Sequence, residues 1–112
     1  MSKIKAKNSS WQLAIEDSQL EEGSMKLVNI GDTPILVVKK EGRVFAVDNR
    51  CSHMECPLSA GKLEGFIIQC PCHDWRFDIR NGEFLDAHEI KLAVFQAKID
   101  NGKVFVKILS TK

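Results

Sequence analysis

The sequence predicts an all-β fold. Short apolar runs alternate with turn residues along the chain, which is typical of antiparallel strands. No stretch has a convincing helical period, and residues 17–22 could form one helical turn at most. The chain has 112 residues, of which 44% are hydrophobic and 28% charged, so we expect one globular domain that spans residues 1–112.

Eight apolar runs are the expected strands. In chain order they cover residues 11–15, 25–30, 35–39, 44–48, 66–70, 75–79, 94–99 and 103–109. The third and fourth runs form a hairpin around Lys40-Glu41-Gly42, and the sixth run ends at a turn over residues 80–83. The region 49–65 has no strand pattern of its own, and a connection of that length is usually functional.

The last two runs form the clearest hairpin. Their connection, residues 100–102, reads Asp-Asn-Gly and supplies residues that accept the positive φ angles of a tight turn. Because side chains alternate across a strand, we expect Phe95, Ala97 and Ile99 to face the core.

Charge and hydropathy exclude several functions. Sixteen basic and 15 acidic side chains leave a net charge of +1, which offers no excess for binding nucleic acid or an anionic membrane. The longest apolar run, residues 35–38, is far shorter than a membrane span, and the basic N-terminus lacks the apolar stretch of a signal peptide. These observations predict a cytoplasmic protein, in which thiols stay reduced unless chemistry uses them.

Cysteine and histidine gather in one part of the chain. All four Cys lie between residues 51 and 72, and two of the three His lie within or beside that segment. The motifs are Cys51-Ser52-His53 and Cys70-Pro71-Cys72-His73. Thiolate and imidazole donors favour zinc, iron or copper over calcium and magnesium, so we expect a metal site.

Two kinds of metal site fit these donors. One is a single tetrahedral zinc bound by Cys51, His53, Cys70 and His73, and the other is a binuclear iron–sulfur centre with the same ligands. Structural zinc usually takes a Cys pair from one arm and a His pair from another. Here each arm is mixed, which favours the iron–sulfur centre.

With these motifs and their surroundings, the chain resembles Rieske-type 2Fe–2S ferredoxins. Residues 58–65 (LSAGKLEG) are similar to the family's stretch between the ligand loops, and residues 70–78 (CPCHDWRFD) are similar to its second loop and following strand. The resemblance implies an antiparallel β-sandwich with a small cluster-binding subdomain at about residues 49–85. It also implies one 2Fe–2S cluster, with Cys51 and Cys70 on one iron and His53 and His73 on the other.

The function implied by the resemblance is one-electron transfer without catalysis by the chain itself. Electrons would pass from a flavin-dependent ferredoxin reductase to a terminal oxygenase or a similar redox enzyme. Two alternatives are an electron-transfer small subunit of a larger reductase, of the nitrite-reductase type, and a zinc-stabilised interaction module.

Five further residues carry expectations. Cys56 and Cys72 stand where the respiratory class of Rieske proteins has a disulfide, so they form either that bond or, as the reducing cytoplasm favours, two free thiols. Trp75 and Phe77 stand where that class has two hydroxyl residues, which predicts a low reduction potential here. Outside the motifs, we expect Trp75 to be a packing residue and His88 to be a solvated surface residue.

Overall fold

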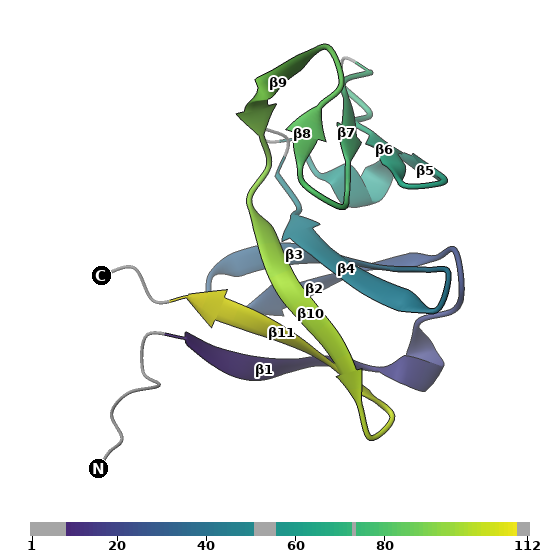
Figure 1. The fold of residues 1–112 in the computed structure, drawn as a ribbon, viewed down its shortest axis with the longest axis vertical. Helices are drawn as coiled ribbons and strands as arrows, with labels where there is room; N and C mark the ends of the chain where they lie inside the picture. The colour runs from purple at the N-terminus through teal and green to yellow at the C-terminus, as the bar shows by residue number, and fades with distance from the viewer. Residues whose placement is uncertain (1–8, 51–55, 73, 110–112) are drawn as a thin grey trace.

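The computed structural model describes residues 9–50, 56–72 and 74–109, which form two antiparallel β-sheets (Figure 1). The six-stranded sheet has the strand order β1-β11-β10-β4-β3-β2, and the five-stranded sheet has the order β5-β6-β7-β8-β9. The larger sheet consists of β1 (Ser9–Glu16), β2 (Met25–Ile30), β3 (Thr33–Lys40), β4 (Arg43–Asp48), β10 (Val94–Asp100) and β11 (Lys103–Leu109). The smaller sheet consists of β5 (Lys62–Glu64), β6 (Ile67–Gln69), β7 (Arg76–Asp78), β8 (Glu83–Phe84) and β9 (Ala87–Lys91). The predicted all-β, antiparallel fold is confirmed.

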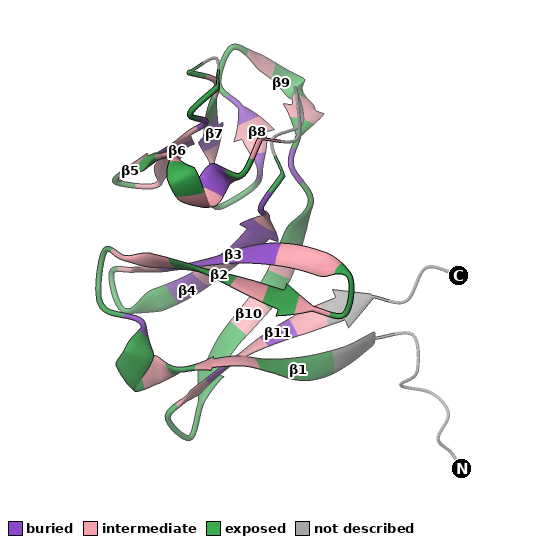
Figure 2. Cartoon of the chain, turned by 180° about the vertical axis from the view of Figure 1, so that it is seen from behind, coloured by how far each residue is buried: buried purple, intermediate pink, exposed green. Residues whose placement is uncertain are grey.

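Strand β3 lies between two hydrophobic cores. Its central residues, 35–38, are fully buried on both faces (Figure 2). Because side chains alternate along a strand, Ile35 and Val37 join a core within the six-stranded sheet, and Leu36 and Val38 join a second core that reaches the smaller sheet. This double burial explains why the sequence is continuously apolar over these four positions.

The second core holds the two sheets together. It contains Leu36, Val38 and Val47 from the larger sheet and side chains from the segment after it: Leu58, Ile68, Cys70, Phe77, Ile79, Phe84 and Leu92. All ten residues are less than one-tenth exposed. The smaller sheet is therefore anchored by apolar packing onto one face of β3 and β4.

Strands β4 and β10 are neighbours although 45 residues separate them in the sequence. Val47 pairs with Val94 and Ala46 pairs with Phe95. The Asp48 N–H donates to the Ala93 carbonyl oxygen at 2.9 Å, just beyond these pairs. Residues 49–93, which include the smaller sheet, thus leave and re-enter the larger sheet at one place (Figure 1).

The sequence missed the shortest elements. The region 49–65, expected to have no strand, contains the 3-10 turn η3 (Leu58–Ala60) and β5. Strands β8 and β9 were also not expected, and β9 extends the smaller sheet beyond residue 85. Segments of two to five residues are too short to show a period, and their strand geometry depends on pairing with neighbours. The helical turn expected at 17–22 is the 3-10 turn η2 (Asp17–Gln19).

The terminal hairpin confirms two of its three expected core residues. Phe95 and Ala97 pack against the core of the larger sheet, but Ile99 is 37% exposed. Strand β4 pairs with β10 only at Val94 and Phe95, so the far end of β10 extends past the strands that could cover Ile99.

Among the described residues, no helix is long and apolar enough to cross a membrane.

Candidate metal centre

Cys70 is the one predicted ligand that lies within the described residues. It directly follows β6, is 1% exposed, and carries a free thiol. Its N–H donates to the Trp75 carbonyl oxygen at 2.7 Å, and its own carbonyl oxygen accepts from the Asp74 N–H at 3.2 Å. These two bonds form a tight turn between β6 and β7 and fix the backbone that carries the thiol. The other predicted ligands, Cys51, His53 and His73, lie outside the described residues.

The turn after Cys70 depends on a residue with left-handed backbone geometry. Asp74 has a φ of 60°, which a non-glycine side chain adopts uncommonly and Asp tolerates better than most. Its carboxylate accepts a hydrogen bond from the side-chain amide of Gln69, Nε2 to Oδ1, at 3.0 Å. The carboxylate therefore joins the two ends of the turn.

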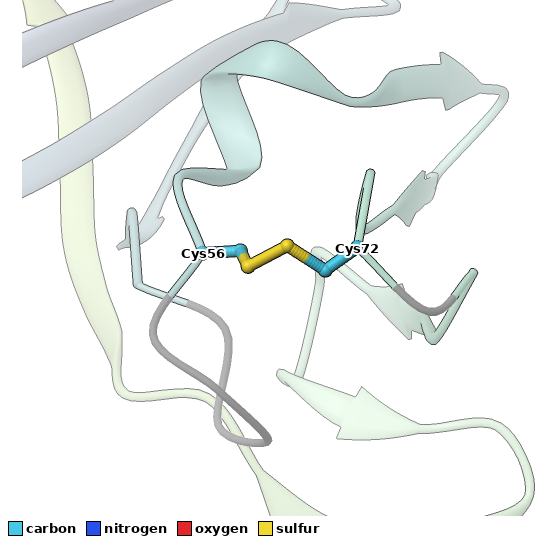
Figure 3. Close-up of a disulfide and its surroundings, with 2 residues drawn as sticks. All are labelled: Cys56 and Cys72. Atoms are coloured by element: carbon cyan, nitrogen blue, oxygen red, sulfur yellow. A yellow bond between two sulfur atoms is a disulfide. The ribbon is translucent and has the colours of Figure 1, made fainter.

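A disulfide joins Cys56 to Cys72 (Figure 3). The two residues are 16 positions apart, with Cα atoms separated by 6.4 Å. The sequence left this pair either bonded or free, and the structure has the bond. The disulfide links Cys56, which is three residues after His53 in the sequence, to Cys72, which directly precedes His73.

Three sulfur atoms gather at this point. The Sγ atoms of Cys56, Cys70 and Cys72 all lie within 4.8 Å of one another. Two of them are bonded together, so Cys70 supplies the available thiol among the described residues. A buried thiol beside apolar neighbours suits a soft metal ion or an iron–sulfur group and does not suit a hard cation, which needs oxygen ligands. The donor chemistry present therefore fits the predicted 2Fe–2S cluster.

Aromatic rings pack together in the second core, which also contains Cys70. Trp75 stacks on Phe84, and Phe77 lies 5.5 Å from Phe84 between ring centroids. The indole is half-buried and packs against the core, as expected for a packing residue. His88, by contrast, has a side chain that is 71% exposed, which agrees with a surface position.

Gly61 allows η3 and β5 to lie directly against the end of β6. A Cβ atom at this position would overlap the carbonyl oxygen of Gln69, the residue before Cys70. The φ of Gly61 is −90°, so the requirement comes from space alone. The sequence placed Gly61 within a family-like stretch but gave no sign of this close approach.

Two matching Asp–Arg ion pairs lie at the ends of strands β4 and β7. Asp48 accepts from both the backbone N–H and the guanidinium of Arg50, and Asp78 makes the same contacts with Arg80. The side-chain hydrogen bond from Arg80 lowers the pKa of Asp78, an effect that partial burial opposes. Burial alone would raise the pKa of Asp48, but the bonds from Arg50 outweigh it and the pKa is lowered. Both carboxylates thus remain charged at neutral pH.

Comparisons with known proteins agree with this geometry. The model of the Rieske [2Fe-2S] domain matches residues 10–104. The ferredoxin component of the alkene monooxygenase system of Xanthobacter autotrophicus is 32% identical over 94 residues, which are 83% of this chain and 75% of that protein. The ferredoxin component of the naphthalene 1,2-dioxygenase system of Pseudomonas putida is 32% identical over 99 residues, 88% of this chain and 95% of that protein.

A solved structure has the same fold. The ferredoxin of carbazole 1,9a-dioxygenase from Nocardioides aromaticivorans superimposes with a TM-score of 0.80 and 26% identity, and the match covers 87% of this chain and 96% of that one. The similarity extends over both sheets because it includes most of each chain. The chain therefore belongs to the Rieske [2Fe-2S] domain family.

Proposed function

We propose that this protein is a one-electron carrier with one Rieske-type 2Fe–2S cluster, bound by Cys51, His53, Cys70 and His73. The observation that carries the proposal is the Cys56–Cys72 disulfide with the buried Cys70 thiol beside it. It links the sequence segments of the two mixed Cys and His motifs. When bound, the cluster supplies reversible uptake of one electron.

The proposed ligands set the charge at the site. Two ferric ions, two sulfides and the thiolates of Cys51 and Cys70 sum to zero when His53 and His73 are neutral. Four thiolates around the same core would give −2, and an electron is more easily added to the neutral site. Rieske centres accordingly span roughly −150 to +300 mV, against about −400 mV for plant-type ferredoxins.

We infer a potential near the lower end of that range from the side chains of Phe77 and Trp75. Hydrogen bonds to cluster sulfurs stabilise the reduced state and raise the potential. Phe77 is fully buried, and neither Phe77 nor Trp75 has the hydroxyl that the respiratory class carries at these two positions. A measured potential well above zero would contradict this part of the proposal.

Two relatives are named as ferredoxin components of oxygenase systems, which supports an oxygenase as a proposed partner. In this chain we infer that electrons arrive from a flavin-dependent ferredoxin reductase and leave to a terminal oxygenase, and that the chain itself catalyses no reaction. We place it in the cytoplasm as one domain over residues 1–112. The same names favour a ferredoxin over the small subunit of a larger reductase.

Optical and electron paramagnetic resonance (EPR) spectra test the proposal. A red-brown protein that bleaches with dithionite and gives a low-g rhombic Rieske signal is expected. Cys70→Ser should abolish the signal, whereas the double variant Cys56→Ser/Cys72→Ser should keep it, because those two sulfurs are engaged with each other. A colourless protein with stoichiometric zinc, after anaerobic reconstitution has been attempted, would reject the cluster. A stable complex with a large reductase subunit would favour the small-subunit alternative.

A further inference from the structure

Asn49 is the one buried polar side chain among the described residues, with an exposed fraction of 4%. It follows β4 and stands two positions before Cys51. Its Oδ1 accepts from the Ser59 N–H at 2.8 Å, and its backbone carbonyl oxygen accepts from the Leu58 N–H at 2.7 Å. Asn49 thus accepts hydrogen bonds from the first two N–H groups of η3. These N–H groups have no acceptor within the helical turn itself, because no turn of helix precedes them.

The same residue is bonded to the larger sheet. The Asn49 N–H donates to the carbonyl oxygen of Pro34 in β3 at 2.9 Å. Immediately beyond, Arg50 forms an antiparallel bridge with Pro57. Asn49 therefore connects the larger sheet to η3 and holds together the two ends of the segment 50–57, which contains Cys51, His53 and Cys56.

We propose that Asn49 is a positioning residue for the two described ends of segment 50–57, at Arg50 and at Cys56, acting through the Ser59 and Leu58 N–H groups. The inference rests on the proposed ligand set, because Cys51 and His53 belong to this segment. Its chemical basis is that a buried N–H needs an acceptor, and an amide oxygen provides one without placing a charge in the core. Leu would fill similar space but leave the Ser59 N–H without a partner.

A residue that only stabilised the fold would have different consequences. Its loss would lower the temperature of unfolding and leave the folded geometry at Cys56 and at the cluster unchanged. Loss of a positioning residue changes the geometry at Cys56 and at the cluster in molecules that remain folded. Cys56 reports the difference directly, because its disulfide with Cys72 forms only if the end of segment 50–57 is correctly placed.

The first measurement uses the cluster-free chain. The equilibrium between the Cys56–Cys72 disulfide and its thiols is measured in glutathione buffers by alkylation and mass spectrometry. For Asn49→Leu we expect an equilibrium constant about tenfold lower than in the original chain, since a buried donor loses its acceptor. Asn49→Ser, whose side chain is too short to reach the Ser59 N–H, should behave in the same way and serves if Asn49→Leu does not fold.

Two variants are matched controls. Ser59→Ala removes a hydroxyl that lies 3.4 Å from the Asn49 amide nitrogen but keeps the N–H that Asn49 accepts, so the disulfide equilibrium should not change. Val47→Ala creates a cavity in the second core two residues away and should lower the unfolding temperature without changing that equilibrium. If Asn49→Leu and Val47→Ala shift the disulfide equally, the positioning role is wrong.

The second measurement uses the chain after iron–sulfur reconstitution. At equal cluster content, Asn49→Leu should shift the g values of the reduced EPR spectrum, and Val47→Ala should not. Unshifted g values in Asn49→Leu would overturn the role toward the cluster. A failure of the proposed function is distinguishable, because the original chain would then give no Rieske signal while the disulfide measurement still tests Asn49.

Discussion

The indole ring of Trp75 lies flat against the phenyl ring of Phe84, with ring centroids 4.0 Å apart and planes 4° from parallel. Phe77 completes the group, because it pairs with Phe84 across β7 and β8 and its ring is 6.2 Å from that of Trp75. These rings belong to or pack against the second core, which also contains Cys70. Strand β8 is only two residues long, so we infer that this packing, more than backbone pairing, holds it in the sheet.

Phe84→Ala is expected to lower the free energy of unfolding by about 3–5 kcal/mol, through lost burial and a cavity under Trp75. Phe84→Leu keeps most of the apolar volume and removes the ring stacking, so its loss should be nearer 1 kcal/mol. Urea denaturation of the two variants measures both values. No measurable loss for Phe84→Leu would show that the ring stacking adds nothing beyond the apolar volume of the side chain.

Gly61→Ala tests the close approach of η3 and β5 to β6. The added Cβ would overlap the Gln69 carbonyl oxygen, which is backbone and cannot turn away, so we expect a loss of about 3 kcal/mol. Gly65→Ala is a suitable comparison: its φ is 61°, but no atom lies within 4 Å of the added Cβ. Its cost should be about 1–2 kcal/mol from backbone strain alone. A milder effect at Gly61 than at Gly65 would contradict the steric requirement.

The Asp78–Arg80 pair predicts part of the acid sensitivity. The Arg80 side-chain hydrogen bond lowers the pKa of Asp78 from 3.8, so this pair stabilises the folded state at pH values above that of the unfolded carboxyl. The contribution is lost as the pH falls below about 4 and through the lowered pKa. Arg80→Gln should therefore flatten the decline of stability over that acidic range, as measured by urea denaturation at several pH values.

Arg43→Gln is the control for this titration. Arg43 lies over the ring of Phe45, 5.3 Å from its centroid, much as Arg80 lies over Phe66 at 4.5 Å. Losing this contact should lower stability by a similar amount at every pH. If the two variants have the same pH profile, the carboxylate of Asp78 is not the group that titrates.

The disulfide is expected to contribute substantially to stability. Closing a loop of this length removes about 3 kcal/mol of chain entropy from the unfolded state, so Cys56→Ser/Cys72→Ser should lower the free energy of unfolding by roughly that amount. Denaturation of the cluster-free chain measures the difference. For the bond to persist in the proposed cytoplasmic location, its reduction potential must also lie below that of the glutathione pool. Full reduction in a glutathione buffer of cytosolic poise would show that the bond is absent there.

The sequence predicted the larger sheet well because its strands carry long local signals. Residues 94–99 and 103–109 flank an Asp-Asn-Gly turn, and residues 35–38 are apolar without interruption. Ile99 was misplaced because a two-residue period says which face a side chain takes but not how far the neighbouring strand extends. Strands β5, β8 and β9 have two to five residues, too few to show a period, and they form only by pairing with neighbouring strands, as β8 does through Phe77 and Phe84.

At the site, chemistry was easier to predict than geometry. The alternation of Cys and His along two arms predicted a metal site and favoured an iron–sulfur centre over zinc. Whether Cys56 and Cys72 are bonded required their positions in space, because the residues fit either state. The role of Asn49 was not visible in the sequence, since a polar residue before a long connection is ordinarily exposed and only the fold buries it.

The direct pairing of β4 with β10 has a consequence for how such a protein can change. If residues 49–93 were replaced by a short turn, Asp48 and Ala93 would still be neighbours and the six strands would keep their order. Residues 49–93, which contain the smaller sheet, are therefore an insertion between two paired antiparallel strands, β4 and β10. The six-stranded sheet can therefore keep its hydrogen bonds when the inserted segment is exchanged or lost in evolution. The condition is that other residues bury the face of β3 and β4 on which the smaller sheet now packs.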